Sequence, residues 1–292
     1  MKICMIGTGY VGLVSGTCFA DIGHQVYCVD KDVSKINKLN SGISPIYEPG
    51  LDELIKKNHK AKRLYFTSDL KKAITVSDII FICVGTPNIK GSLKVDLSFV
   101  FKCTKEILSI TKKKKIIVTK STVPIGTGDQ IENIIKKKKK LFSVISNPEF
   151  LREGEAIRDF RYPDRIIIGS NSKNEFKTMK KLYSPLINKG AKFFTTSRRG
   201  AELIKYAANA FLATKITFIN EIANLCEKSG INVKDIALGI GSDTRIGSRF
   251  LRPGPAYGGS CFPKDTKGLV FAAEKYKTNL SIVKSVIKSN SD

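Results

Sequence analysis

Histidine and paired cysteine are scarce in this 292-residue sequence. It has two histidines, His24 and His59, and no C-x-x-C pair. Zinc sites and disulfide frameworks need clustered ligands or paired cysteines, so we expect neither a metal nor a disulfide. Isolated cysteines are typical of a reducing compartment, and the cytoplasm is the predicted location. The cysteines are Cys4, Cys18, Cys28, Cys83, Cys103, Cys226 and Cys261.

Long apolar runs are missing as well. No run approaches the ~20 residues that span a bilayer. The opening MKICMIGTGYVG carries one lysine and then breaks at glycines, which indicates a buried strand and not a signal peptide. Hydrophobic residues at 42% and charged residues at 26% are ordinary for a soluble globular protein. The length predicts about two domains.

Acidic residues are outnumbered, with 26 Asp and Glu against 50 Lys and Arg and a net charge of +24. Such a charge is compatible with nucleic-acid binding. However, the runs Lys112–Lys115 and Lys136–Lys140 each precede an apolar strand, where lysines favour helix C-termini and stay solvated. No aromatic side chain is interleaved with them to stack on bases. We predict a solvated basic surface that could attract an anionic small substrate, with neither nucleic acid nor membrane as partner.

Short apolar runs alternate with helical stretches through roughly the first 200 residues. The runs are rich in Ile, Val and Phe at consecutive positions, as expected for strands covered on both faces. This alternation predicts an α/β fold with a doubly wound parallel sheet and right-handed crossovers. The predicted strands are 2–7, 25–30, 64–67, 78–84, 115–121, 141–146 and 165–170, and the predicted helices are 10–22, 31–40, 68–76, 97–110, 127–138 and 173–183.

The pattern changes after residue 198. The segment RRGAELIKYAANAFLATKITFINEIANLCEKSG predicts one long helix that ends at Gly230, because apolar residues recur at spacings of three and four. We therefore expect a Rossmann-like dinucleotide-binding domain at 1–198 and an all-helical domain at 199–292. Shorter helices are predicted near 233–240, 263–276 and 279–290.

A glycine-rich turn follows the first predicted strand. Gly7-Thr8-Gly9-Tyr10-Val11-Gly12 matches the G-x-G-x-x-G pattern, whose glycines let the backbone approach a pyrophosphate at a helix N-terminus. Asp30 lies 23 residues after Gly7, close to the ~20 expected for the acid that binds ribose hydroxyls. A carboxylate there repels a 2′-phosphate, so we predict NAD, not NADP, as the cofactor. The loops Val84–Pro87 and Lys120–Pro124 should line the same crevice, although each alone could be a helix cap.

Two pairs of residues are placed as if for acid–base chemistry. Glu149 and Glu153 lie four apart after a predicted strand, and Lys205 and Asn209, also four apart, share one face of the long helix. Taken singly, such a lysine would more often be a surface residue, and the two acids a solvated first turn. The two pairs indicate catalysis only in combination with the predicted dinucleotide site.

One cysteine differs from the others. Pro263 fits the first position of a helix, which places Cys261 just outside its N-terminus. The helix dipole and Lys264 would favour the thiolate nucleophile there, and Gly258 and Gly259 would let a substrate approach the sulfur. Taken alone, Cys261 could equally be a small buried thiol. With NAD, the set predicts that an alcohol is oxidised to an aldehyde, trapped by the thiolate, oxidised again to a thioester and released by water as an acid.

The segments that carry these residues resemble the UDP-glucose/GDP-mannose dehydrogenase family, in the same order along essentially the whole sequence. GGSCFPKD is the most specific of them. The resemblance implies oxidation of UDP-glucose to UDP-glucuronate with two NAD per product. The other segments are MKICMIGTGYVGLVSGTCFADIGHQVYCVD, SPIYEPGLDEL, KSTVPIGTGD, NPEFLREGEAIRDFRYPDRIIIG and ELIKYAANAFLATKITFINEIA.

The resemblance also implies catalytic roles. Cys261 would be the nucleophile, and Lys205 with Asn209 would stabilise oxyanions at the sugar C6. Asp265 would act with Lys205 in proton transfer. The residues that would place and activate the hydrolytic water are Thr122, Glu149 and Glu153.

Binding residues follow from the same resemblance. Phe250-Leu251-Arg252-Pro253-Gly254 resembles the family's sugar-nucleotide loop, and Arg245 matches an arginine that family members insert into the neighbouring subunit's site. A homodimer packed along the long helix is expected. The other implied substrate-binding residues are Glu149, Phe150, Leu151, Arg152, Glu153, Lys205, Asn209 and Gly258. The implied NAD contacts are Gly7, Gly9, Tyr10, Val11, Gly12, Asp30, Lys35, Thr86, Thr122, Glu153 and Lys264.

One feature of the family is not expected in this sequence. Family members carry a second Rossmann-like domain that grips the UDP, and the sequence stops about where that domain would begin. We therefore expect NAD binding in this form with little turnover of UDP-glucose. Two alternatives stay open: a GDP-mannose or UDP-N-acetyl-hexosamine 6-dehydrogenase, which product analysis would distinguish, and a non-catalytic NAD-binding fragment.

Overall fold

The computed structural model describes residues 1–92, 94–138 and 140–291. The chain folds as two units. The first comprises Met1–Thr86 and Asp96–Lys205, and the second comprises Pro87–Val95 and the chain from Tyr206 onward. The separation falls within the long helix, a few residues from the 198/199 domain boundary expected from the sequence, which remains a prediction.

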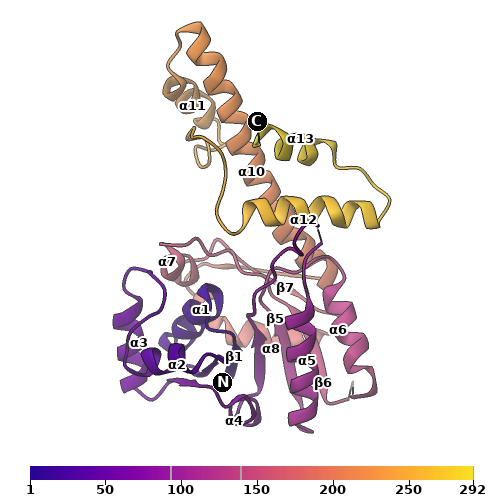
Figure 1. Ribbon diagram of the computed structural model, residues 1–292. Coiled ribbons are helices and arrows are strands. Elements are labelled where there is room, and N and C mark those ends of the chain that lie inside the picture. Colours follow the sequence, from indigo (N-terminus) through magenta and orange to yellow (C-terminus); the bar gives the residue numbers. More distant parts are fainter. Residues whose placement is uncertain (93, 139, 292) are drawn as a thin grey trace. The chain divides into compact units, whose positions relative to one another are not determined.

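The first unit is built on an eight-stranded sheet (Figure 1). Its spatial order is β3-β2-β1-β4-β5-β6-β7-β8, so the chain builds outward from β1 first to one side and then to the other. This confirms the predicted doubly wound fold. The strands are β1 (Lys2–Ile6), β2 (Gln25–Val29), β3 (Leu64–Thr67), β4 (Ile79–Ile82), β5 (Lys115–Thr119), β6 (Phe142–Ser146), β7 (Arg165–Gly169) and β8 (Lys192–Thr196).

Helices cover both faces of this sheet, α1 and α3 on one side and α5 and α6 on the other (Figure 1). Successive strand residues alternate between the two layers, since Ile3 and Met5 pack with α1 and α3 while Cys4 and Ile6 pack with α5 and α6. The helices are α1 (Tyr10–Asp21), α2 (Val33–Asn40), α3 (Leu51–Lys60), α4 (Leu70–Val76), α5 (Ser98–Ile110), α6 (Thr127–Ile135), α7 (Ala156–Arg161), α8 (Lys173–Leu182) and α9 (Ser184–Ile187), with a 3₁₀ turn at Lys136–Lys138.

Strand register aligns the loops that follow the strands. Ile6 is opposite Ile82, Ile82 is opposite Thr119, and Thr119 is opposite Ser146. The last residues of β1, β4, β5 and β6 therefore form one row. The turn after β1 and the loops after β4, β5 and β6 leave the sheet at the same edge, as ligand-binding crevices in doubly wound sheets require.

The sheet departs from the predicted parallel arrangement only at β7 among the described strands. This strand meets β6 at a single register pair, Ser146 with Gly169, and runs antiparallel to it. The connection, residues 147–164, is irregular apart from the six-residue α7, so it lacks the long crossover helix that usually accompanies a parallel return. β7 and β8 then continue as a parallel pair.

The lysine runs are exposed with one exception. Lys112, Lys113 and Lys114 are exposed, and so is the 3₁₀ turn that carries Lys136–Lys138, whereas residue 139 lies outside the described residues. Lys115 is buried, which corrects the prediction that its whole run is solvated. Its ammonium donates to the carbonyls of Thr75, at 3.1 Å, and Ser77, and burial lowers its pKa. Here a lysine satisfies backbone oxygens at the end of α4.

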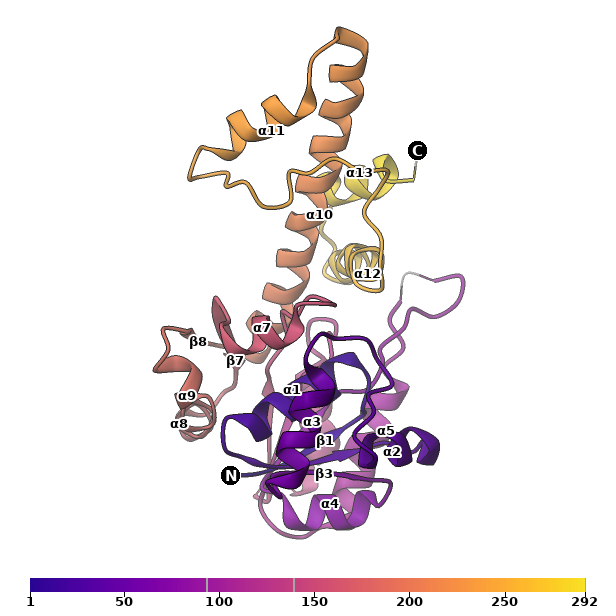
Figure 2. The same ribbon diagram turned by 90° about the vertical axis from the view of Figure 1, so that its left-hand side faces the viewer.

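The second unit is helical, as predicted. The long helix α10 (Arg198–Ser229) runs into it without interruption (Figure 2) and ends before Gly230, whose φ of 70° continues the chain in the left-handed region. Tyr206 and Ala210 of α10 pack on Leu269 of α12 and on α13. The other helices are α11 (Val233–Gly241), α12 (Phe262–Lys275) and α13 (Ser281–Ser289). Within the described part of the chain, no helix combines the length and apolarity needed to cross a membrane.

Candidate active site

The turn after β1 has the geometry of a pyrophosphate cradle. Gly7 has φ of 100°, and a Cβ there would lie 2.8 Å from the carbonyl oxygen of Cys83. A Cβ at Gly12 would lie 1.9 Å from the carbonyl oxygen of Gly7, so both positions exclude a side chain. Gly9 faces open space and caps α1 without a side-chain hydrogen bond. The first amides of α1, at Tyr10 and Val11, thus begin a helix N-terminus suited to an anion, and the residues present fit the dinucleotide.

Asp30 is held at the end of β2 by its neighbours. One carboxylate oxygen accepts hydrogen bonds from the amide and hydroxyl of Thr8 at 2.9 and 2.8 Å, and the other accepts from the amide of Asp32 at 3.1 Å. Lys35 lies 3.6 Å away. Burial acts to raise the pKa of Asp30, but these hydrogen bonds and Lys35 together hold it below its ordinary value. Asp30 is therefore a fixed negative charge beside the glycine turn.

We expect Asp30→Asn to raise the dissociation constant of NAD by about 10- to 100-fold, since a hydrogen bond to a charged group is worth about 1.5–3 kcal/mol. Removing the negative charge should also weaken discrimination against NADP. Calorimetric titration of both nucleotides measures the two effects. The matched control is Asp32→Asn, which changes an exposed acid that caps α2. Unchanged NAD affinity in Asp30→Asn would remove the ribose role from this residue.

Two loops predicted to line the crevice are joined to each other. The hydroxyl of Ser121 donates to the carbonyl oxygen of Val84 at 2.6 Å, and the hydroxyl of Thr86 donates to the carbonyl oxygen of Thr122 at 2.9 Å. Thr86 is buried and Thr122 is half-buried. The loop after β4 and the loop after β5 thus form one layer at the carboxyl edge of the sheet.

A buried acid in the EPG segment was not predicted to belong to the site. Glu48 accepts hydrogen bonds from the Tyr10 hydroxyl, from the amide of Gly154 at 2.9 Å and from the amide of Ile157 at 3.1 Å. Burial, followed by the hydrogen bond to Glu48, raises the pKa of Tyr10 to about 12. Glu48 therefore ties the glycine turn to the loop that ends at α7. The YEPG sequence could have drawn attention to Glu48, but it does not predict which groups Glu48 contacts.

The loop after β6 separates the two predicted acids. Glu149 is buried and lies 3.0 Å from the ammonium of Lys205, which is also buried. The amide of Leu151 donates to the other oxygen of Glu149 at 2.5 Å. Glu153 is exposed and lies in the irregular segment before α7, so the two acids share no helix face. The structure thus brings Glu149 to Lys205 and leaves Glu153 at the surface.

Neighbours in this loop shape the pair's surroundings. The Phe150 ring lies between two cations, with the Lys205 nitrogen 5.2 Å and the Arg165 guanidinium 4.1 Å from its centre. Arg152 is exposed and pairs at 2.6 Å with both Glu155 and Asp159, which raises its pKa. Its side chain therefore closes the loop onto α7.

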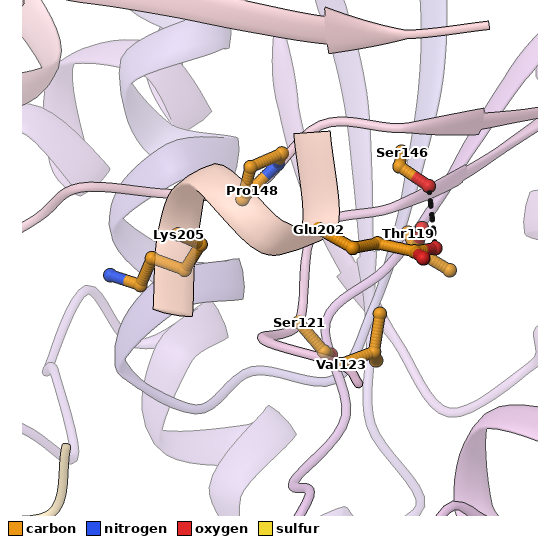
Figure 3. Close-up of a pocket in the computed structure, with 7 residues that line it drawn as sticks. All are labelled: Thr119, Ser121, Val123, Ser146, Pro148, Glu202 and Lys205. Atoms are coloured by element: carbon orange, nitrogen blue, oxygen red, sulfur yellow. Dashed lines mark hydrogen bonds between the residues drawn. The ribbon is translucent and has the colours of Figure 1, made fainter. Parts of the chain in front are cut away.

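A small pocket, partly open to solvent, adjoins Lys205 at this edge (Figure 3). Two further buried charges belong to this region. Burial raises the pKa of Glu202 to about 7 and lowers that of Lys120 to about 8. Glu202 was not predicted as a site residue, because in sequence it appears only as a near neighbour of Lys205. Lys120 lies in a loop that was predicted to line the crevice, but its burial was not predicted. The pocket is lined by Thr119, Ser121, Val123, Ser146, Pro148, Glu202 and Lys205.

In the second unit, Cys261 caps α12 and is exposed. Pro263 is the second helical residue, one later than predicted, because α12 begins at Phe262. Asp265 is fully buried in the first turn, where it accepts a hydrogen bond from the Asn209 amide at 2.6 Å and pairs with Lys264. The structure thus joins Asn209, Lys264 and Asp265 at the first turn of α12, the helix that Cys261 caps.

The other cysteines are all buried. Burial raises the pKa of Cys18 and Cys83 to about 12 and that of Cys103 to about 11, which keeps these thiols protonated and unreactive near neutral pH. Exposure thus singles out Cys261 as the accessible thiol of the chain. Among the described residues, no cluster of His, Cys, Asp and Glu could hold a metal ion.

The predicted sugar-nucleotide loop has a defined shape. Phe250 has φ of 65°, and its ring meets that of Phe262 edge-on at 6.2 Å. Leu251 is buried, and the amide of Gly254 donates to the Asn220 side chain at 2.9 Å. Arg252 is exposed and Pro253 is half-buried. The loop is therefore fixed at its ends, and the side chain of Arg252 is exposed to solvent.

Two other predicted substrate residues are open to solvent. Gly258 has no neighbour within 4 Å of an added Cβ. Arg245 exposes 87% of its side chain and pairs with Asp243 at 2.6 Å, which raises its pKa. The insertion of Arg245 into a neighbouring subunit's site remains a prediction.

Comparison with known proteins places the chain among sugar-nucleotide dehydrogenases. Residues 1–187 match the NAD binding domain of the UDP-glucose/GDP-mannose dehydrogenase family, and residues 199–292 match its central domain. The chain is 55% identical over 295 residues to the UDP-glucose 6-dehydrogenase of Rhizobium meliloti, covering 99% of this chain and 67% of that protein. It is 50% identical over 292 residues to the UDP-glucose 6-dehydrogenase TuaD of Bacillus subtilis, covering 99% of this chain and 62% of that protein.

Solved structures give the same picture. A UDP-glucose dehydrogenase from Pyrobaculum islandicum superposes with a TM-score of 0.94 at 36% identity, covering 99% of this chain and 67% of that one. A GDP-mannose dehydrogenase from Pseudomonas aeruginosa superposes with a TM-score of 0.79 at 36% identity, covering 100% and 68%. The chain thus spans about two thirds of the length of the proteins it matches.

Proposed function

The chain belongs to the UDP-glucose/GDP-mannose dehydrogenase family, and from this premise we propose that it oxidises UDP-glucose at C6 to UDP-glucuronate. It is an oxidoreductase whose N-terminal part is the family's NAD binding domain. The choice of UDP-glucose follows the names of relatives that are 55% and 50% identical to it. The free thiol of Cys261 fits the reducing cytoplasm predicted from the sequence.

Two NAD molecules, bound one after the other, would each supply the acceptor for one hydride from C6, the first at the alcohol stage and the second after the aldehyde has been trapped. The Cys261 thiolate adds to the aldehyde carbon and forms a C–S bond, which gives a thiohemiacetal. Loss of hydride from that carbon leaves a thioester. Water then attacks the carbonyl, the C–S bond breaks, the acid leaves and the thiol is restored.

The remaining residues would act through charge and proton transfer. Lys205 supplies a cation, and Asn209 an amide donor, to the oxyanion that develops at C6. Asp265 takes part in proton transfer with Lys205. Glu149, through its 3.0 Å contact, sets the position of the Lys205 ammonium. Thr122 and Glu153 place the hydrolytic water.

Binding roles follow the residues that match the family. Gly7–Gly12 and Asp30 bind the pyrophosphate and ribose of NAD, with Lys35, Thr86 and Lys264 as further contacts. The segments Phe150–Arg152 and Phe250–Gly254, with Gly258, bind the sugar nucleotide. The fixed ends of the 250–254 loop support this role, because a preformed loop loses less entropy on binding.

One observation supports the reaction type most strongly. Cys261, the exposed thiol, is the N-cap of α12, and the buried Asp265 follows it in the first turn of that helix. The test uses these 292 residues within a protein of the relatives' full length, incubated with NAD and, in separate reactions, UDP-glucose, GDP-mannose and UDP-N-acetyl-hexosamines. We expect two NADH per UDP-glucuronate with UDP-glucose. A product of another sugar nucleotide, or a stoichiometry of one, would contradict the proposal.

We also propose that two copies of the chain associate along α10. Phe211, Phe218 and Leu225 recur every seven residues and expose 67%, 49% and 63% of their surfaces. A stripe of this spacing lies along one side of a helix, as in paired helices. A second copy supplies the same stripe and so covers both. Sedimentation velocity of the wild-type chain and of Phe218→Glu measures the association, and a monomeric wild type would contradict it.

A further inference from the structure

Glu202 is a buried acid on α10 that none of the proposed roles uses. It is 2% exposed. Its carboxylate accepts hydrogen bonds from the amide of Gly126 at 2.6 Å, from the amide of Gly128 at 2.8 Å and from the hydroxyl of Ser146 at 3.0 Å. Figure 3 shows the last of these bonds, with the Glu202 and Lys205 side chains leaving the same stretch of α10 in different directions.

The two glycine amides lie where the loop after β5 becomes α6. We call residues 121–126 the Thr122 loop. Gly126 caps α6 at φ of 88° and has no side chain of its own to accept from the helix, so the cap comes from Glu202. A Cβ at Gly128 would lie 2.9–3.0 Å from Arg198, Glu202 and Ser146, so the carboxylate approaches closely only because a glycine stands there.

The Thr122 loop is fixed at both ends. At its start, Ser121 donates to the carbonyl oxygens of Val84, at 2.6 Å, and Ile82, at 3.3 Å. At its end, Glu202 holds Gly126. Lys205 lies one turn after Glu202 on α10 and pairs with Glu149. One helical turn therefore holds both the loop that carries Thr122 and the buried ion pair.

We propose that Glu202 is a positioning residue whose ionised carboxylate holds the Thr122 loop in place relative to Lys205. The proposal rests on the proposed function, in which Thr122 places water and Lys205 stabilises charge at C6. An ionised carboxylate can accept from all three donors at once. A protonated carboxyl loses the charge that strengthens these bonds and turns one acceptor site into a donor, so it holds the three donors less tightly.

The charges around Glu202 set where this change occurs. Burial raises the pKa of Glu202 to about 7, and the negative charge of Asp129 on α6 adds to the rise, while the bonds from Gly128, Gly126 and Ser146 oppose it. On α10, Arg198 directs its guanidinium to Asp129 and Glu132, and Lys205 pairs with Glu149. β5 and β6 contribute the uncharged side chains of Thr119 and Ser146 to the same pocket. Ionised Glu202 should thus hold the Thr122 loop above neutral pH, and protonated Glu202 should release it below neutral pH.

The free energy of unfolding must fall as the pH rises, whereas the Thr122 loop is held more firmly. The pKa of Glu202 is higher in the folded chain than the ordinary 4.5, so the folded state binds the proton more tightly than the unfolded state. Stability is therefore lost as pH rises from about 4.5 to about 7. A glutamine at this position carries no charge at any pH. The difference in Tm, Glu202→Gln minus wild type, should accordingly increase across that interval.

Hydrogen exchange of the full chain tests the proposal directly. At pH 8 the amides of segment 121–130 should exchange about tenfold faster in Glu202→Gln than in wild type, since the loss of one charge-assisted bond is worth at least about 1.5 kcal/mol. Strands β1 and β4 should be unchanged. The matched control is Glu132→Gln, which removes the acid of α6 that pairs with Arg198 of α10.

Wild type alone provides a second reading that does not depend on the variant's folding. After correction for intrinsic rates, segment 121–130 should be better protected at pH 8 than at pH 6. Equal protection at the two pH values, or equal exchange of wild type and Glu202→Gln at pH 8, would overturn the proposal. So would faster exchange throughout the sheet, which marks a purely structural role.

Activity supplies the third reading. With UDP-glucose, wild-type kcat should fall as the pH is lowered through about 7, and Glu202→Gln should show no such step. The KM for NAD of Glu202→Gln should stay within about twofold of the wild-type value. Failure of a protein of the relatives' full length that carries these residues to oxidise UDP-glucose would contradict the proposed function, and the exchange measurements would still decide the role of Glu202.

Discussion

Cys261→Ser is expected to abolish release of UDP-glucuronate while leaving NAD binding intact. Cys261 is the exposed thiol of the chain and caps α12. Serine is a far poorer nucleophile at its free pKa, and an ester formed on it would hydrolyse slowly. Loss of an essential covalent nucleophile lowers kcat by up to about 10⁶-fold. The measurement is the rate of acid formation, followed by product analysis together with calorimetric NAD binding.

The control is Cys226→Ser, which replaces a buried thiol of the same unit. Its effect should be confined to stability, because a buried hydroxyl without a partner is unfavourable. Iodoacetamide should label wild type at one fast-reacting site and Cys261→Ser at none. Acid formation by Cys261→Ser at the wild-type rate would mean that no covalent bond to this residue is needed.

Strand positions could be predicted from the sequence because the buried strands are short runs of mostly apolar residues, many of them Ile, Val or Phe. β8 lacked that signal, since KFFTT is half-exposed and ends in threonines. The antiparallel step at β7 was not predicted either, because it depends on the path of the irregular connection that contains α7. Helix α3 could have been found, as Asp52 and Glu53 open it and Lys57, His59 and Lys60 close it in agreement with the helix dipole.

The site residues also fall into those that the sequence could predict and those that it could not. The glycine turn and Asp30 form a local pattern whose spacing alone predicts a geometry, and the structure has that geometry. Glu149 and Lys205 were separately noticed, but their 3.0 Å contact joins residues 56 positions apart, which no local period reports. Glu48 and Glu202 were missed for the same reason. Each is an ordinary acid in sequence, and only folding surrounds it with backbone amides from distant loops.

Lys205→Ala is expected to lower turnover by about 10²–10³-fold, with NAD affinity unchanged. A preorganised donor aimed at a developing oxyanion in a dry site is worth about that much, and Lys205 is 4% exposed. The same change leaves Glu149, 6% exposed, without its cation. Removal of one partner of a buried pair costs about 3–5 kcal/mol of stability. A loss of activity could therefore arise from either cause.

The double variant Lys205→Met with Glu149→Gln separates the two causes. It removes both charges and keeps the volume, so it should recover most of the free energy of unfolding that Lys205→Ala loses, because buried pairs are replaced by neutral groups with little penalty. Turnover should not recover, since no cation remains beside C6. Urea unfolding and steady-state NADH formation measure the two quantities on the same samples. If turnover returned together with stability, Lys205 would serve only to neutralise Glu149, and the oxyanion would have to be stabilised by other donors.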